Sequence, residues 1–404
     1  MFRLRAVNEV IEESIRYLRH HPSVKRVSLI HALNKISGET VYSAVMLPPF
    51  PKSTMDGYAV KSSNCSSASP SSPVILKIKK ESILAGEKGN TLGENEAIRI
   101  ETGGFLPEGA DAVIPVEDTE QRGNLLYVYK SIGKYENVSL PGEELDINDI
   151  IIRKGDILRP WHLAALEAIG REEVGILDIK ACVFCTGSEF KEKFKPFTRK
   201  LVKGWLLEKG FTEVSVKVLP DDVDIISKNL GKAVMEYDVI IVCGGTAKGE
   251  KDYTIKAIQK LNPSYLLHGV RIRPGRTMCF SVVNDRPVVA ISGLPVAAFS
   301  SLELVVKPIL ERWLKIRFLE YPKIRAKLVR RVTSKMGFKS FIRLRVYERK
   351  GQIYAEPLVA GGSGSIRSLV LGNAFLIVEE DLEGFDEGEE VEVELYAPVY
   401  KENL

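Results

Sequence analysis

From residue 179 onwards, short apolar and β-branched runs alternate with segments of helical spacing, and this alternation constrains the fold more than any other feature. The runs read IKACVFC, VSVKVL, DVIIVCGG and PVVAISG, and helices are predicted at about 198–210, 222–236, 252–261 and 296–315. A strand that is apolar on both faces must be buried on both sides, as in a parallel sheet covered by helices. We therefore predict a central three-layer α/β/α domain over residues 177–318.

Polar turns follow three of the predicted strands. These turns read TGSE from Thr186, GGTAKGEKD from Gly244 and SGLP from Ser292. Ligands of parallel α/β sheets bind at the carboxyl ends of the strands, where such turns gather. The sequence therefore predicts a ligand site built from these three turns.

The remaining sequence predicts three further parts. Residues 7–20 show helical spacing, residues 26–46 read as a second helix followed by an extended segment, and residues 157–170 read as a helix that begins near Pro160 and ends near Gly170. Residues 74–140 and 323–404 alternate apolar and polar residues, which is typical of all-β domains. The serine-rich stretch Ser62–Pro73 is predicted to be a flexible surface loop. These patterns give a helical and linker domain over 1–45 and 141–176, a β-rich domain over 46–140 and a C-terminal all-β domain over 319–404.

Length and composition bound the class of protein. The chain has 404 residues, more than one hydrophobic core organises. With 57 basic and 53 acidic residues its net charge is +4, too small to argue for a nucleic-acid or membrane partner. No apolar run reaches the roughly 18 residues of a transmembrane helix, and the first residues lack the apolar stretch of a secretory signal. Five cysteines do not make a disulfide framework in a chain of this size, so a cytoplasmic protein is expected.

Two patterns have more than one interpretation. Cys182 and Cys185 form a C-x-x-C that suits a redox or metal pair, but residues three apart on a strand point to opposite faces, about 10 Å apart, so two buried core thiols are favoured. Lys323–Lys350 carries eleven basic residues and Glu379–Glu394 carries ten acidic ones. The basic run suits RNA, but pairing between strands of opposite charge is favoured. The five histidines show no metal-ligand spacing.

A series of distinctive motifs runs along the chain. The first is PPFPKSTMDGYAV, from Pro48 to Val60, and AIRIETGG, ADAVIPVE, KGDIL, TGSE, GGTAKGEKD, VRIRPG, SGLP and SGSIRS follow between Ala97 and Ser368. The first motif is similar to P-x-(F/W)-x-x-S-x-M-D-G-Y-A, and in this string and in the order of the others the chain resembles the MoeA family of molybdopterin molybdenumtransferases, which includes the E domain of gephyrin. The resemblance covers about residues 5 to 400 of the chain.

The resemblance implies a fold and a reaction. The fold is an elongated homodimer of four domains, with a molybdopterin-binding α/β domain, a β-rich second domain and a C-terminal β-barrel-like domain. The active site would lie between the α/β domain of one subunit and the β-rich part of the other. Adenylylated molybdopterin would receive molybdate or tungstate and release AMP, assisted by Mg²⁺. A molybdopterin adenylyltransferase is the partner that this reaction implies.

The same resemblance assigns residues to these tasks. Asp56, Glu189 and Asp252 would be catalytic carboxylates and ligands of Mg²⁺, an ion that prefers oxygen donors. Arg273 would be catalytic and Arg276 would bind substrate, since a guanidinium holds phosphate or molybdate with its planar fork. Glycine-rich turns present bare N–H groups to phosphate. The other expected binding residues are Thr102, Thr186, Gly187, Gly244, Gly245, Thr246, Gly249, Gly293, Pro295, Ser363 and Ser365.

The chain departs from the family pattern at four places in the α/β domain. The Gly-Asn-Pro after G-L-P is Val296-Ala297-Ala298, the aspartate of TGDE is Ser188, the serine of the glycine-rich turn is Ala247, and D-S-N is Thr198-Arg199-Lys200. These places line the family's pterin-nucleotide pocket, so weaker or altered substrate recognition is expected. The alternatives are a catalytically degenerate paralogue that binds molybdopterin or pairs with an active relative, and another enzyme that shares the α/β domain, such as an adenylyltransferase.

Overall fold

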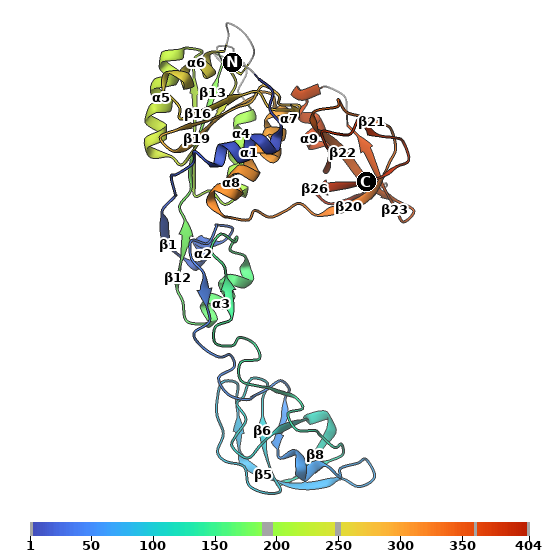
Figure 1. The fold of residues 1–404 in the computed structure, drawn as a ribbon. Coiled ribbons are helices and arrows are strands. Elements are labelled where there is room, and N and C mark those ends of the chain that lie inside the picture. The colour runs from blue at the N-terminus through green and yellow to red at the C-terminus, as the bar shows by residue number, and fades with distance from the viewer. Residues whose placement is uncertain (1–2, 188–196, 247–251, 359–361, 402–404) are drawn as a thin grey trace. The chain divides into compact units, whose positions relative to one another are not determined.

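The computed structural model describes residues 3–187, 197–246, 252–358 and 362–401, and the chain divides into two compact units (Figure 1). The first unit contains residues 1–39, 152–164 and 171–404, and the second contains residues 40–151 and 165–170. The N-terminal residues therefore fold with the long C-terminal part of the chain. Among the described residues, no helix is long and apolar enough to span a membrane.

The first unit contains the predicted α/β sheet. Its six strands lie in the order β14-β13-β15-β19-β18-β16, and β18 runs antiparallel to both of its neighbours. The four strands predicted from the sequence are parallel, as expected. The six strands are β13 (Lys180–Thr186), β14 (Glu213–Leu219), β15 (Val239–Cys243), β16 (Tyr265–His268), β18 (Cys279–Val283) and β19 (Arg286–Ile291).

Helices cover both faces of this sheet, as Figure 1 shows. One apolar core contains Phe184 and packs under α5 (Val223–Glu236) and α6 (Tyr253–Lys260). The other contains Phe280 and packs under α1 (Val7–Ile15), α4 (Thr198–Glu208), α7 (Pro295–Ser301) and α8 (Lys307–Leu314). Helix α5 begins where the Asp222 carboxylate accepts hydrogen bonds from two backbone N–H groups. The predicted three-layer α/β/α arrangement is confirmed.

The helix predicted at 296–315 is interrupted. A π-helical segment, Leu302–Val306, joins α7 to α8. It places Glu303 in the interior, where Oε1 accepts hydrogen bonds from Trp205 Nε1 at 2.6 Å and from the Tyr321 hydroxyl at 3.0 Å. One buried carboxylate thereby ties α4 to the connection that leads into the C-terminal strands.

The C-terminal residues form a closed five-stranded barrel. Its pairings run β22-β23-β20-β26-β24 and return to β22, so each strand of the ring has two neighbours. Lys323, Arg325 and Lys327 of β20 lie opposite three glutamates of β26, which confirms the predicted pairing of opposite charges. The strands of the ring are β20 (Lys323–Leu328), β22 (Lys339–Arg349), β23 (Gln352–Pro357), β24 (Ala374–Val378) and β26 (Glu390–Leu395). Two short strands, β17 (Ile272–Arg273) and β27 (Tyr400–Lys401), also pair with β22. The other elements are β21 (Val332–Thr333), which pairs with β25 (Gly384–Phe385), and the helix α9 (Ile366–Val370).

The second unit is β-rich, as predicted. Its main sheet has the order β7-β4-β6-β5-β9-β8, with one apolar cluster around Leu76 and Leu126 and another around Ile98 and Ile100. The elements of this sheet are β4 (Gly57–Val60), β5 (Val74–Ile83), β6 (Glu96–Ile100), β7 (Ala112–Pro115), β8 (Thr119–Arg122) and β9 (Leu125–Val128). Smaller pairings join β2 (Val41–Tyr42) to β11 (Ile150–Ile152) and β3 (Lys52–Ser53) to β10 (Val138–Ser139). In the first unit, β1 (Val24–Ser28) pairs with β12 (Glu173–Leu177). A further helix is α3 (Pro160–Ala168).

Two local predictions are wrong in part. Residues 26–46 contain only the single helical turn α2 (Leu29–Ala32), because the preceding residues pair with β12 as strand β1. Ser62–Pro73 is a loop, but it starts with a 3-10 turn and buries Cys65 and Ala68 in the apolar cluster of the second unit. The N–H and hydroxyl of Ser62 donate to the Asp111 carboxylate at 2.6 and 3.1 Å, which fixes the start of the loop.

Candidate functional site

The turns that follow β13 and β15 pack against each other at the carboxyl edge of the α/β sheet. Gly244 has φ +108°, and a Cβ at this position would lie 2.6 Å from the Thr186 carbonyl oxygen. The Thr254 hydroxyl donates to the Gly244 carbonyl at 3.1 Å and lies 3.4 Å from Thr186 Oγ1. Gly187 is buried and continues the first turn, and Gly245 continues the second with φ +64°. Only glycine fits so close a contact, so no side chain covers the backbone of Gly244 at this edge.

A cavity of about 440 Å³ adjoins these turns. Arg273 and Arg276 enter it from one stretch of chain, Ser292 enters from the turn after β19, and Ser363 comes from the segment before α9. Its full lining is Ile272, Arg273, Pro274, Gly275, Arg276, Thr277, Ser292, Leu294, Ala297, Lys335, Phe338 and Ser363. Thr246 is buried and its hydroxyl lies 3.3 Å from that of Thr277, which connects the cavity to the glycine turn. The arrangement offers cations, hydroxyls and bare backbone to an anionic ligand.

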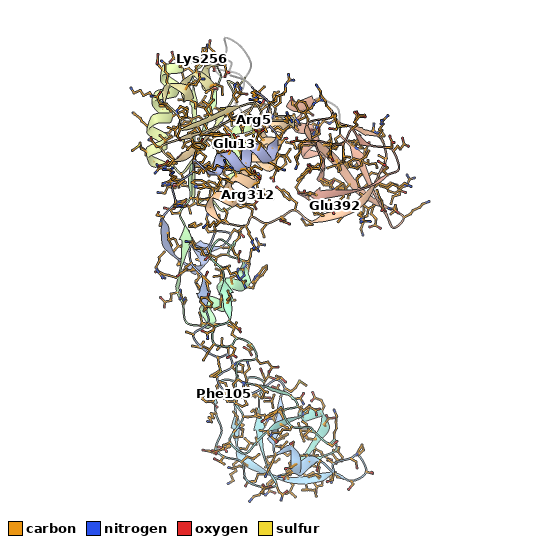
Figure 2. The ribbon with its side chains drawn as sticks, in the orientation of Figure 1. Arg5, Glu13, Phe105, Lys256, Arg312 and Glu392 are labelled. Atoms are coloured by element: carbon orange, nitrogen blue, oxygen red, sulfur yellow. The ribbon has the colours of Figure 1, made fainter. Side chains whose placement is uncertain are left out.

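The N-terminal segment supports the stretch that leads to Arg273. The N–H of Arg5 donates to the Gly269 carbonyl at 3.2 Å, and the N–H of Arg271 donates back to the Arg5 carbonyl at 2.8 Å. Glu13 of α1 lies 3.9 Å from the Arg5 guanidinium and accepts a hydrogen bond from the Tyr265 hydroxyl at 2.9 Å (Figure 2). The first residues of the chain therefore form a parallel β-bridge, Arg5 to Val270, beside the stretch that lines the cavity.

The turn after β19 is fixed by two side-chain hydrogen bonds. The Leu294 N–H donates to Ser292 Oγ at 3.2 Å, and Thr198 Oγ1 donates to the Gly293 carbonyl at 2.6 Å. Pro295 is buried and is the first residue of α7. Thr198, which the sequence marks as a departure from the family pattern, thus holds the turn that lines the cavity.

Asp252 stands directly before α6 and is the most perturbed carboxylate near these turns. Its side chain is only 14% exposed, and among the described residues its Oδ1 has no hydrogen-bond partner. Burial raises the pKa of Asp252 to about 6, against a smaller opposing effect of the Ile255 N–H, whose geometry falls short of a capping hydrogen bond. The Oδ2 atom lies 3.9 Å from Nδ1 of His268. A buried carboxylate with an unused oxygen is suited to holding a cation.

A second cavity, of about 290 Å³, lies on the barrel and contains Ser365. Its other lining residues are Arg330, Pro357, Leu358, Arg367, Ser368 and Leu371. Behind Ser368 lies Arg343, which is 7% exposed and donates from Nε to Ser368 Oγ at 3.2 Å. Burial lowers the pKa of Arg343, and no carboxylate of the described residues lies within ion-pair distance of it. In the sequence Arg343 belongs to the basic run, but its place between the apolar residues 341 and 344 is a signal of burial.

Asp56 belongs to the second unit and is exposed in the turn before β4. Its Oδ1 accepts hydrogen bonds from the Thr102 N–H at 2.7 Å and from the Thr102 hydroxyl at 2.8 Å. These two bonds, the backbone one first, lower the pKa of Asp56. The structure therefore pairs two residues that the motifs single out separately, and it leaves the second oxygen of the carboxylate available.

Three family models match successive parts of the chain. Residues 4–170 match the MoeA N-terminal region (domains I and II), residues 182–312 match a probable molybdopterin-binding domain, and residues 325–396 match the MoeA C-terminal region (domain IV). A putative molybdopterin biosynthesis protein of Methanocaldococcus jannaschii is 31% identical over 402 residues, covering 96% of each chain. The chain belongs to the MoeA family.

Other MoeA relatives agree in sequence and fold. The molybdopterin molybdenumtransferase of Staphylococcus aureus strain COL is 28% identical over 398 residues, covering 96% of this chain and 94% of that protein. The crystal structure of the molybdopterin biosynthesis MoeA protein from Pyrococcus horikoshii OT3 superposes with a TM-score of 0.80 at 29% identity, covering 98% of this chain and 100% of that one. The family is one of molybdenum cofactor biosynthesis, and the closed barrel and α/β domain are shared features of its fold.

Several departures from the MoeA pattern are accommodated by packing. Val296 and Ala298 are buried in the apolar core under α7, while Ala297 lines the cavity and its carbonyl accepts a hydrogen bond from Ser301 Oγ at 2.8 Å. The replaced G-N-P segment thereby becomes the first turn of a helix. The expected site residues Glu189 and Gly249, and the departures Ser188 and Ala247, lie outside the described residues.

The residues present fit one ligand position for Mg²⁺. Asp252 offers a buried oxygen without a donor, which is the type of atom that this ion binds. Within the described ranges no three His, Cys, Asp or Glu side chains group as a metal site. Mg²⁺ is commonly held by one or two carboxylates together with substrate phosphates and water, so a single protein carboxylate here is consistent with it.

Proposed function

We propose that the chain is a molybdopterin molybdenumtransferase, which inserts molybdate or tungstate into adenylylated molybdopterin and releases AMP. The observation that supports this most strongly is the cavity that brings Arg273, Arg276, Ser292 and Ser363 to the edge of the glycine turns. Its volume of about 440 Å³ is in the range of pockets for small organic ligands. Two guanidinium groups in it suit a substrate that carries a pyrophosphate.

Each part of the site has a proposed task. Arg273 and Arg276 hold and neutralise the phosphate oxygens, and the N–H group of Gly245 adds a hydrogen bond to them. Asp252 would hold Mg²⁺, which when bound supplies positive charge to the phosphoanhydride that is cleaved. Asp56 is proposed as a second catalytic carboxylate, kept ionised by its hydrogen bonds from Thr102.

The second cavity is proposed to receive the metal oxyanion. Molybdate and tungstate are tetrahedral oxyanions, and a buried guanidinium beside hydroxyl groups binds such groups through charge-assisted hydrogen bonds. Arg343 is a buried cation without a carboxylate partner in the described part of the chain, and it donates to the hydroxyl of Ser368, which lines the second cavity together with Ser365. An unpaired buried charge is costly, so a bound anion would stabilise it.

The proposed reaction is tested by AMP release. Purified chain is incubated with adenylylated molybdopterin and Mg²⁺, and AMP is measured with and without molybdate or tungstate. AMP release that requires the oxyanion is expected, and Asp252→Asn should abolish it. Asp224→Asn is the matched control, since its side chain is 82% exposed on α5. Absence of oxyanion-dependent AMP release by the wild-type chain would contradict the proposal, and tight pterin binding without turnover would favour a scaffold.

The proposed function also implies an assembly and a supplier. We propose a cytoplasmic homodimer that receives its substrate from an enzyme that adenylylates molybdopterin. Light scattering after size exclusion should then give twice the 45.0 kDa of one chain. A monomeric mass at micromolar concentration would contradict the dimer. Co-purification with the adenylyltransferase from the same cells tests the partner.

A further inference from the structure

Two of the five free cysteines lie side by side beneath the glycine turns. Cys185 and Cys243 are direct partners in the parallel pairing of β13 with β15. Both belong to the same apolar core and are 1% and 3% exposed. Cys182 and Cys279 lie in the core on the opposite face of the sheet, but on strands β13 and β18, which are not neighbours, and Cys65 lies in the second unit. No other two cysteines are therefore direct partners on adjacent strands.

The two thiols are neighbours and affect each other's pKa. The adjacent Cys243 thiol lowers the pKa of Cys185 against the opposing effect of burial, and the nearby Arg199 guanidinium also lowers it. The adjacent Cys185 thiol and burial raise the pKa of Cys243. Cys185 is therefore the better nucleophile of the two, because the thiolate is the reactive form of a cysteine.

The geometry of the strands permits a covalent bond between these residues. Neighbouring strands lie about 4.7–4.9 Å apart, and the Cα atoms of bridged cysteines are usually about 4.4–6.8 Å apart. Directly paired residues of parallel strands present their side chains on the same face of the sheet. The pair Cys185 and Cys243 satisfies both conditions, whereas Cys182 and Cys185 point to opposite faces.

We propose that Cys185 and Cys243 form a reversible disulfide on exposure to hydrogen peroxide, and that this bond restrains the two turns of the substrate site. The Cys185 thiolate attacks one peroxide oxygen, the O–O bond breaks, and the departing hydroxide takes a proton to become water. Cys243 then attacks the resulting sulfenic sulfur, and its hydroxyl leaves as a second water. Two thiols are oxidised by two electrons, and one peroxide is reduced to two waters.

The effect on the substrate site rests on the proposed function, while the disulfide itself does not. Cys185 is followed directly by Thr186, and Cys243 is followed directly by Gly244. These two residues already pack so closely that a Cβ at Gly244 would lie 2.6 Å from the Thr186 carbonyl oxygen. A bond between the strands leaves the turns no freedom to adjust to a ligand. A displacement of about 1 Å costs an enzyme about a hundredfold in rate, so a loss of tenfold or more in AMP release is expected.

The disulfide is tested first on the wild-type protein by mass. Reduced chain is treated with hydrogen peroxide, unfolded, and alkylated with a maleimide. Five thiols should react before oxidation and two fewer after it, with a peptide that links Cys185 to Cys243 and is released by dithiothreitol. Oxidised glutathione should act more slowly, because both sulfurs are buried. Five reactive thiols after peroxide, or a link between other cysteines, would overturn the proposal.

The restraint is tested by hydrogen exchange and by variants. Backbone amides of residues 186–187 and 244–246 should exchange more slowly in the oxidised chain, whether or not the protein turns over substrate. Cys243→Ser should abolish the crosslink and the peroxide sensitivity of AMP release, and Cys182→Ser should preserve both. Unchanged exchange in the crosslinked protein would refute the restraint. If the protein forms the disulfide on oxidation but releases no AMP in its reduced form, the proposed function is refuted instead.

Discussion

Replacement of Asp252 by asparagine should make the chain more stable while it removes activity. Burial raises the pKa of this carboxyl from 3.8 to about 6, so the ionised form is penalised in the folded state. One pKa unit corresponds to about 1.4 kcal/mol, and the shift of roughly two units therefore amounts to about 3 kcal/mol at most. Residual solvent contact of the side chain reduces this to an expected gain of about 1–2 kcal/mol for the neutral amide.

The gain should depend on pH with a definite sign. The folded pKa lies above the unfolded one, so the folded chain binds the proton more tightly and wild-type stability falls as pH rises from about 4 to about 6. Above that window the ionised carboxylate destabilises the folded wild type fully, so the variant exceeds the wild type in stability most at pH 8. At pH 5 the folded carboxyl is largely neutral but the unfolded one is already ionised, so about half of the difference in stability remains, and it vanishes only below the unfolded pKa of 3.8. The groups around it are His268 on β16, Cys279 on β18 and Lys256 on α6.

Thermal unfolding followed by tryptophan fluorescence provides the assay. Trp205 and Trp313 are buried in helices that cover the α/β sheet, so their signal reports on this unit. A gain of 1–2 kcal/mol corresponds to an increase in melting temperature of roughly 2–8 °C for a unit of this size. The measurement uses a chelator so that Mg²⁺ does not stabilise the wild type. An equal or lower melting temperature of the variant at pH 8, or a gain of the same size at pH 5, would refute the reasoning.

Three further substitutions test the site. Thr102→Val removes one hydrogen bond from Asp56 and should raise the pKa of that carboxyl, which moves the acid limb of the AMP-release profile to higher pH. Gly245→Ala should destabilise the chain by about 2 kcal/mol or more in thermal unfolding, since φ is +64° and the new Cβ would lie 2.3 Å from Thr254 Oγ1. Arg343→Met should weaken molybdate binding by about tenfold or more in calorimetry, through loss of charge-assisted hydrogen bonds, without unfolding the barrel.

The α/β sheet was predictable wherever strands were apolar on both faces, and less so elsewhere. The four parallel strands stand out as continuous apolar runs, but β16 and β18 were missed. A signal for β18 exists, because β18 and β19 are joined by only Asn284 and Asp285, with φ of +50° and +62°. Such a two-residue turn with positive φ is typical of a tight hairpin. Asn and Asp adopt positive φ more readily than most residues, so Asn-Asp between two apolar runs indicates such a hairpin in the sequence.

The candidate site was predictable to the extent that strand ends gather at one edge. This rule brings Thr186, Gly244 and Gly293 together, because each ends a parallel strand or follows one within two residues. It cannot find Arg343, which is buried and donates to Ser368, a residue 25 positions further along the chain. Nor does a motif reveal that Thr198 donates to the Gly293 carbonyl. Thr198 stands where the family has a different residue, so the family pattern does not indicate which group Thr198 contacts.

Strand β17 pairs with the barrel, although it lies outside the stretch of sequence that forms the other barrel strands. Ile272 and Arg273 pair with Lys339 and Ser340 of β22, although they are encoded between two strands of the α/β sheet. The barrel is consequently not a detachable module. A chain shortened after residue 318 would leave the arginine-bearing strand without its neighbour, and an exchange of barrels between relatives would have to preserve the edge that receives it.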